Sequence, residues 1–161
     1  MNKVCNIDTT QLDKILANLS EENRKKAMVN ALKEGGNVLK ENTQQNLIKK
    51  LGSGATSMIK WKKKPMTEGV GVITEKDYVE VIVTILRDFR LKWFEMGTTE
   101  RYRKIRGIDS KGKKYVKRGE KGGYTGYIKG LHFFKEAREN TSPIEEAIIR
   151  AMEAEINKLM Q

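Results

Sequence analysis

Apolar positions along the chain follow a helical spacing in three stretches and a strand-like alternation between them. Small and apolar residues recur at helical spacing over residues 12–19, 27–42 and 144–159. Cap-type residues come before the second and third stretches, at Ser20 and Ser142. We therefore predict a short helix near the N-terminus, a long helix after Ser20 and a C-terminal helix after Ser142.

The long helix carries a face of small residues that would allow another backbone to approach closely. Ala27, Ala31 and Gly35 share this face, and Gly36 follows directly. Each of the two glycines costs about 1 kcal/mol relative to alanine in a helix interior. The sequence leaves two reasons for them open, a kink in the helix or close packing. We expect the helix to end before Gly52.

The strand-like alternation lies in the middle of the chain and predicts a β-hairpin. Residues 69–73 and 78–85 have the pattern of two strands on either side of a short polar loop, residues 74–77. Residues 56–61 have the pattern of a further strand. One face of the second hairpin strand is continuously apolar and is predicted to face the core: Val79, Val81, Val83 and Ile85.

These elements predict an α+β fold in a single domain that spans residues 1–161. A chain of 161 residues can build one substantial hydrophobic core, and two domains would be crowded. We expect an antiparallel sheet of three to four strands packed against the long N-terminal helix and the C-terminal helix. Residues 100–130 have little apolar periodicity and are rich in glycine, tyrosine and lysine. We expect them to form a basic arm or loop.

Residues 89–99 join the packed half of the chain to this basic half. They read F-R-L-K-W-F-E-M-G-T-T. We predict a short helical turn whose aromatic residues, Trp93 and Phe94, close the end of the sheet. Gly97 stands where a left-handed helix cap is expected.

The positive charge of the chain is concentrated in one segment. The formal net charge is +11, and residues 101–129 contain eleven basic residues against two acidic ones, Asp109 and Glu120, a net charge of +9. The remainder of the chain is therefore close to neutral. Such a concentration of charge points to contact with an anionic partner. The candidate partner or phosphate contacts are Arg101, Arg103, Lys104, Arg106, Lys113, Lys114, Lys117 and Arg118.

Three interpretations of this basic segment remain open. Alternating tyrosines and lysines can follow a nucleic-acid backbone while the rings stack on bases. The same charge can orient the segment on an acidic protein partner, with more effect on association rate than on affinity. A solvated loop that contributes only to solubility is the third interpretation.

Residues that commonly carry catalysis are sparse. His132 is the only histidine and Cys5 the only cysteine, which excludes an intrachain disulfide and the common zinc-binding spacings. The glycines of the basic segment are not part of a phosphate-binding loop. We therefore predict no catalytic, cofactor-binding or metal-binding residue, no cofactor, and a protein that is not an enzyme. The sequence starts without a secretion signal and contains no apolar run of membrane-spanning length, so we expect a soluble, intracellular protein.

Three short motifs occur in an order that resembles a family of phage proteins. They are A-L-K-E-G-G-N-V-L-K (residues 31–40), W-F-E-M-G-T (residues 93–98) and H-F-F-K-E-A (residues 132–137). In this order they resemble the neck and tail-component family of long-tailed bacteriophages, the gene-product-ten-like family. In that family an aromatic segment ends in E-x-G-T, and an aromatic pair and an alanine precede a last helix. The matching positions are Trp93, Phe94, Glu95, Gly97, Thr98, Phe133, Phe134 and Ala137.

The chain departs from the family pattern at two places. The segment before the aromatic pair usually contains proline in the family, whereas here it reads Gly130-Leu131-His132. The stretch over residues 100–129 is also longer than is usual in the family. Both departures fall on the basic segment or directly after it.

The resemblance implies a structural virion-assembly protein of the phage head–tail junction, which completes the neck or tail by forming a homo-oligomeric ring. Its implied partners are other phage neck, portal or tail proteins, in the virion and, during assembly, in the host cytoplasm. Contact with DNA is left open, and no membrane is implied. The family provides no catalytic residues, so the matching positions are expected to define the fold. The alternative, from a different class, is a nucleic-acid-binding protein that uses residues 101–129.

Overall fold

The computed structural model describes residues 20–56, 64–75 and 79–159, with only the backbone for residues 115–121. The described chain has an α+β fold, as predicted. The helix predicted over residues 12–19 lies outside the described residues, and so does nearly all of the strand predicted over residues 56–61.

Helix α2 (Glu21–Leu51) is the central element, and both of its ends follow the predicted signals. The side chain of Ser20 accepts a hydrogen bond from the backbone N–H of Asn23 (3.4 Å) and caps the first turn. Gly52 ends the helix with a φ of 56°, in the left-handed region that favours glycine. A short helix, α3 (Ser53–Thr56), follows directly.

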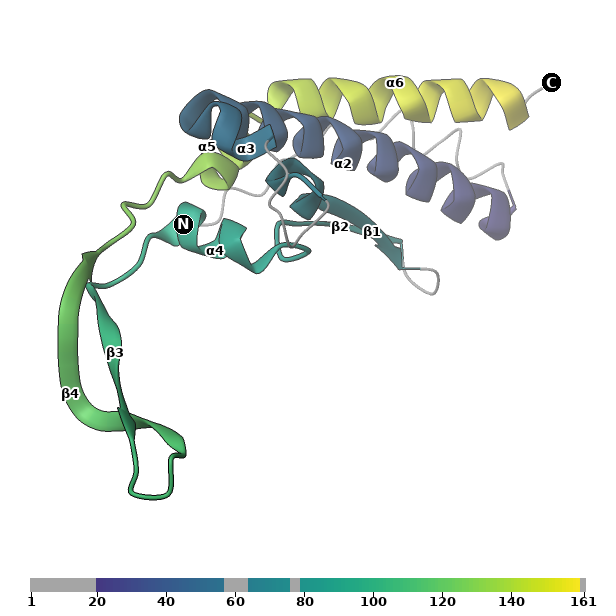
Figure 1. Ribbon diagram of the computed structural model, residues 1–161. Coiled ribbons are helices and arrows are strands. Elements are labelled where there is room, and N and C mark those ends of the chain that lie inside the picture. Colours follow the sequence, from purple (N-terminus) through teal and green to yellow (C-terminus); the bar gives the residue numbers. More distant parts are fainter. Residues whose placement is uncertain (1–19, 57–63, 76–78, 160–161) are drawn as a thin grey trace.

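Helix α6 (Ser142–Leu159) packs along one side of α2 (Figure 1). A Cβ atom on Gly35 would lie 2.5 Å from Cγ1 of Ile148, so a larger residue would not fit without a shift. Helix α2 continues through Gly35 as one helix, and close packing therefore explains this glycine. The same interface buries a cluster of Ala27, Ala31, Met152 and Ile156.

A β-hairpin packs on another side of α2, so that α2 lies between α6 and the hairpin (Figure 1). Its strands, β1 (Gly71–Glu75) and β2 (Glu80–Thr84), are antiparallel, as predicted. A Cβ atom on Gly36 would lie 3.0 Å from Cγ1 of Val81 and 3.6 Å from Cγ2 of Val83. The apolar face of β2 is thus turned toward the core, whereas Ile82 on the opposite face is 40% exposed. Gly35 and Gly36, which are adjacent in sequence, therefore allow close packing on two sides of α2, against α6 and against the hairpin.

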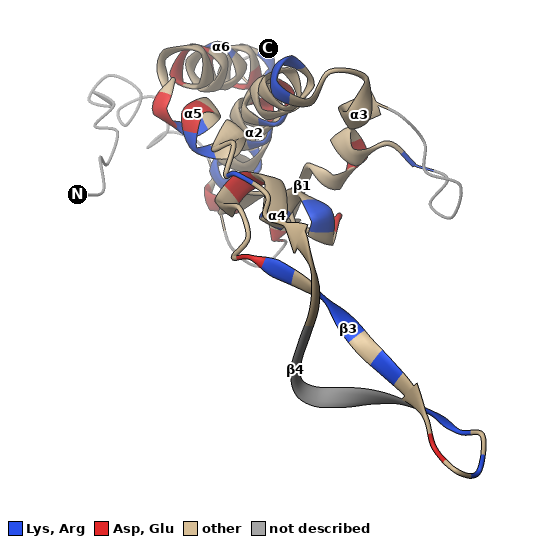
Figure 2. Ribbon diagram, turned by 60° about the vertical axis from the view of Figure 1, so that its left-hand side comes forward, with Lys and Arg blue, Asp and Glu red and all other residues tan. Residues whose placement is uncertain are grey.

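The sheet differs from the predicted single sheet of three to four strands. Among the described residues, β1 and β2 form one two-stranded sheet, and β3 (Arg101–Ile108) and β4 (Lys114–Gly126) form a separate one. The second sheet projects from the body as an arm (Figures 1 and 2). Its strands are rich in charged residues and glycine and have no continuous apolar face for a core, so they pair with each other and not with β1 or β2.

The main core lies between the C-terminal half of α2 and three short helical segments. These segments are the 3₁₀ helix η1 (Met66–Gly69), α4 (Phe89–Met96) and α5 (Phe133–Glu139). The core brings α4 and α5 into contact where the arm leaves the body. The most deeply buried large side chains of this core are Leu47, Val70, Leu91 and Phe133.

Within the described residues, no helix combines the length and hydropathy needed to cross a membrane.

Candidate functional site

The arm joins the body at a hydrogen-bonded junction, which we call the arm base and which consists of residues 94–98 and 128–135. The backbone N–H of Thr98 donates to the carbonyl of Ile128 (2.9 Å). The backbone N–H of Ile128 donates to Oγ1 of Thr98 (2.9 Å). The two chain segments that enter and leave the arm are therefore joined to each other before strand β3 begins.

The carboxylate of Glu95 caps helix α5 from a distant part of the chain. Its Oε2 accepts a hydrogen bond from the backbone N–H of Phe134 (2.8 Å), and its Oε1 accepts one from that of Lys135 (3.0 Å). These N–H groups lie in the first turn of α5, where helix donors are unpaired and the helix dipole favours a negative charge. His132, at the N-cap position of α5, makes no side-chain cap bond. Glu95 therefore supplies the cap that the local sequence lacks.

Gly97 ends α4 in a conformation and a space that require glycine. Its φ of 80° and ψ of −178° lie outside the left-handed helical region predicted for this cap, in a positive-φ region that favours glycine. Its N–H donates to the carbonyl of Trp93 (2.8 Å). A Cβ atom on Gly97 would lie 2.8 Å from both the carbonyl oxygen of Ile128 and the backbone nitrogen of Gly130. The close approach of the two segments of the arm base therefore depends on this glycine.

Strands β3 and β4 are antiparallel, and their register shifts at several points along the arm. Near the base, the rings of Tyr102 and Tyr124 lie 5.5 Å apart between centroids. The hydroxyl of Tyr102 donates to Oε2 of Glu100 (2.8 Å), and this hydrogen bond raises the pKa of Tyr102. The predicted arm is thus a paired ribbon with an aromatic contact near its base.

The tip of the arm is a turn organised by one carboxylate. Oδ1 of Asp109 accepts hydrogen bonds from the backbone N–H groups of Lys111 (3.0 Å) and Lys113 (2.8 Å). Gly112 occupies a left-handed position in this turn, with a φ of 77°. The turn consequently presents the lysine side chains of the tip to solvent.

Basic residues lie along β3 and at the tip of the arm (Figure 2). Their side chains are exposed. Within the part of the chain that the structure describes, none of these nitrogens has a carboxylate at ion-pair distance. The side chains of Lys117 and Arg118 lie outside the described part. Among the described residues, the basic side chains of the arm are therefore not paired with carboxylates. The exposed candidates from the sequence are Arg101, Arg103, Lys104, Arg106, Lys113 and Lys114.

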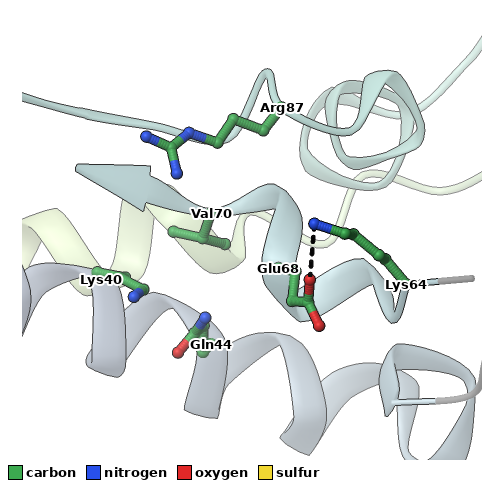
Figure 3. A pocket seen from close by; sticks show the side chains of 6 residues that line it. All are labelled: Lys40, Gln44, Lys64, Glu68, Val70 and Arg87. Carbon is green, nitrogen blue, oxygen red and sulfur yellow. Dashed lines mark ion pairs between the residues drawn. The ribbon is translucent and has the colours of Figure 1, made fainter. Parts of the chain in front are cut away.

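A polar pocket on the body was not predicted from the sequence (Figure 3). It has a volume of about 350 Å³ and lies between α2, η1 and the turn before α4. Three basic side chains line it, and the guanidinium of Arg87 donates from Nη2 to the carbonyl of Val72 (3.0 Å). No spacing motif joins these residues, which come from three separate segments. The lining consists of Lys40, Gln44, Lys64, Glu68, Val70 and Arg87.

A buried ion pair at the start of α4 was also not predicted. Nε of Arg90 lies 3.0 Å and 3.1 Å from the two carboxylate oxygens of Asp88, and both side chains are less than a tenth exposed. Asp88 also accepts a hydrogen bond from the backbone N–H of Arg90 (3.1 Å) as the N-cap of α4. The hydrogen bond to Asp88 raises the pKa of Arg90. This pair fixes the start of the helix that leads into the arm base.

The described residues contain no group of three or more histidine, cysteine, aspartate or glutamate side chains placed to hold a metal ion. His132 is exposed, and Cys5 lies outside the described residues. Comparison of the chain with protein-family models, curated proteins and solved structures finds no match.

Six of the eight family-like residues predicted from the sequence belong to the arm base, and the other two, Trp93 and Ala137, lie next to it on α4 and α5. Phe133 and Ala137 are fully buried, and Phe94 and Phe134 pack against the same core. Trp93 does not close the end of a sheet as predicted. It is 43% exposed and its ring packs edge-on against Phe89, with 5.1 Å between centroids. Adjacent residues on a helix point in different directions, so burial of Phe94 leaves Trp93 on the outer face.

Proposed function

We propose that this chain is a structural subunit of a phage head–tail junction, which completes the neck or tail by assembling into a homo-oligomeric ring and carries out no catalysis. The observation that supports it most is the contact between Glu95 and the first turn of α5. The E-M-G-T motif and the aromatic pair, which carry the resemblance, are far apart in sequence but bonded to each other. Six of the eight matching positions then lie at the base of a projecting arm: Phe94, Glu95, Gly97, Thr98, Phe133 and Phe134.

A projecting arm is well suited to a subunit that must reach a neighbour. The hydrogen bonds of the arm base hold both segments of the arm on the body core, so the orientation of the arm follows that of the body. In a ring, identical arms of net charge +9 repel one another unless each meets an opposite charge. We propose that each arm contacts an acidic face of another neck, portal or tail protein, in the virion and during assembly in the host cytoplasm.

We also propose that the sheet of three to four strands is completed in the ring. Strands β1 and β2 pair only with each other among the described residues, so each has an outer edge that a strand from a neighbour could join. Ile73 and Ile82 lie opposite each other on the outer face, and each is about two-fifths exposed. A neighbouring subunit would cover this apolar pair.

The second candidate is a nucleic-acid-binding protein that uses residues 101–129. The pairing of β3 with β4 favours it, because a two-stranded ribbon fits the major groove of duplex DNA. Its exposed arginine and lysine side chains would meet phosphates, and binding would then weaken steeply as salt increases. Tight, sequence-dependent DNA binding by the isolated protein would favour this candidate over the structural subunit.

The test of the proposed function is genetic and structural. The gene is expected beside genes for portal, capsid and tail proteins, and its deletion is expected to leave filled heads and free tails unjoined in electron micrographs. Addition of the purified protein to such an extract should restore joined particles. A gene outside any phage or prophage, or a deletion that leaves particle yield unchanged, would contradict the proposal.

A further inference from the structure

The polar pocket on the body carries an inference that does not depend on the partner of the arm. We propose that it is a binding site for a phosphate-type oxyanion. Its basic side chains come from separate segments: Lys40 from α2, Lys64 from the chain before η1, and Arg87 from the turn after β2. Figure 3 shows Val70 between Arg87 and the α2 side chains.

The charges that line the pocket do not cancel. Lys64 and the single lining carboxylate, Glu68, form an exposed ion pair at 3.6 Å. Among the described residues, no carboxylate lies at ion-pair distance from Lys40 or Arg87. The lining therefore keeps a net charge of +2, contributed by one ammonium and one guanidinium. Both groups line the pocket and therefore attract an anion into it.

The guanidinium of Arg87 is held in place by the protein backbone. Its Nη2 donates to the carbonyl of Val72. Its Nε, Cζ and Cδ occupy the space that a Cβ atom on Gly71 would fill, so the side chain lies directly against the backbone of a buried glycine. A donor that is already fixed loses little conformational entropy when a ligand binds. Gly71 thus positions Arg87 for binding.

The chemistry of the lining suits a phosphate-type oxyanion. A guanidinium offers a planar set of donors that can bond two oxygens of one phosphate, and an ammonium adds a mobile point charge. Free inorganic phosphate and the phosphodiester of a nucleic acid share this chemistry. The same group of residues would recognise either source, and competition with a DNA duplex separates the two.

The experiment is a titration of the full-length protein with inorganic phosphate at constant ionic strength, followed by the backbone amide signals of Gly71 and Val72 in nuclear magnetic resonance spectra. We expect saturable shifts of these signals. The variant Arg87→Gln should weaken binding about tenfold, as expected for loss of one charged hydrogen-bond donor. Lys49→Gln is the matched control, because Lys49 is an exposed lysine of α2 half a turn out of phase with Lys40.

A second variant tests the position of the Arg87 guanidinium separately from its charge. Gly71→Ala keeps every charge but displaces the guanidinium, so it should weaken phosphate binding as Arg87→Gln does. Thermal unfolding checks that each variant is folded, and Lys40→Gln takes the place of Gly71→Ala should the latter not fold. Absence of saturable shifts, or an equal effect of Lys49→Gln, would overturn the proposal.

The source of the oxyanion is identified by competition. A short DNA duplex is added to the phosphate-bound protein in which Lys113, Lys114, Lys117 and Arg118 are replaced by glutamine, which weakens DNA contacts of the arm. Displacement of phosphate at the Gly71 amide identifies a nucleic-acid phosphodiester as a ligand of the pocket. Retention of phosphate in the pocket identifies the free phosphate ion as its ligand. Both results require the pocket to bind the oxyanion, and each assigns one source.

Discussion

Glu95 holds the first turn of α5 through the backbone N–H of Phe134, at 2.8 Å, although 38 residues of chain, including the whole arm, separate the two. This bond and its neighbour at Lys135 join the end of α4 to the start of α5. The arm thus begins and ends on one structural unit.

Replacement of Glu95 by alanine should destabilise the protein by about 1–2 kcal/mol, the usual effect of losing a helix cap. Two N–H groups of α5 would lose their acceptor. Urea unfolding, followed by circular dichroism, measures the change. Glu153→Ala is the control, because Glu153 is an exposed carboxylate of α6, and its effect should stay within about 0.5 kcal/mol. Equal effects of the two variants would mean that the cap contributes nothing.

Replacement of Gly97 by alanine should destabilise the protein by about 1–3 kcal/mol. The positive φ is unfavourable for alanine, and the added Cβ atom would press on backbone atoms of Ile128 and Gly130, which cannot rotate away. Gly54→Ala is the matched control, since no atom lies within 4 Å of a Cβ atom at Gly54. Thermal unfolding compares the two, and a Gly97→Ala protein as stable as Gly54→Ala would contradict the close approach.

Replacement of Asp88 by asparagine should cost about 3–5 kcal/mol, because it leaves the charge of Arg90 buried and without its counter-ion. Asparagine is as good an N-cap as aspartate, so the substitution isolates the charge from the cap. Chemical unfolding is the measurement. The double variant Asp88→Asn, Arg90→Met should recover part of the loss. A double variant as unstable as the single one would exclude the buried charge as the cause.

The hydroxyl of Tyr102 should titrate above the ordinary tyrosine pKa of 10.0, because it donates a hydrogen bond to the Glu100 carboxylate, and this bond stabilises the protonated form. The folded-state pKa is raised, so the stabilising contribution is present below pH 10 and is lost as the pH rises through the raised value. The ring carbon signals of Tyr102 in a magnetic resonance titration report it. Glu100→Gln should return the pKa toward its ordinary value, and no change on this substitution would exclude the carboxylate as the cause.

Local patterns in the sequence predicted the body well and the long-range contacts poorly. Ser20 and Gly52 mark the ends of α2, and the alternation through Val81 and Val83 identifies the core face of β2, because caps and side-chain direction depend on neighbours in sequence. The bond from Glu95 to Phe134 and the position of Arg87 over Gly71 depend on tertiary packing, which no spacing encodes. Charge and glycine predicted an arm but did not separate a loop from a paired ribbon.

The proposed contact between the arm and an acidic partner protein can be tested by replacing Lys113, Lys114, Lys117 and Arg118 with glutamine. The matched control replaces four lysines of the body, Lys26, Lys33, Lys49 and Lys92, in the same way. Circular dichroism should show both proteins folded, because the described side chains of the substituted residues, Lys113 and Lys114, are exposed and the core cluster does not include them.

The deciding measurement is the yield of joined, infectious particles when each variant is added to heads and tails from the deletion extract. Our account predicts that the arm variant joins heads to tails poorly, and more poorly as salt increases, since screening weakens the remaining charges. The body-lysine control should join them at the normal yield. A normal yield from the arm variant would contradict the account and leave the arm as a solvated ribbon without a partner.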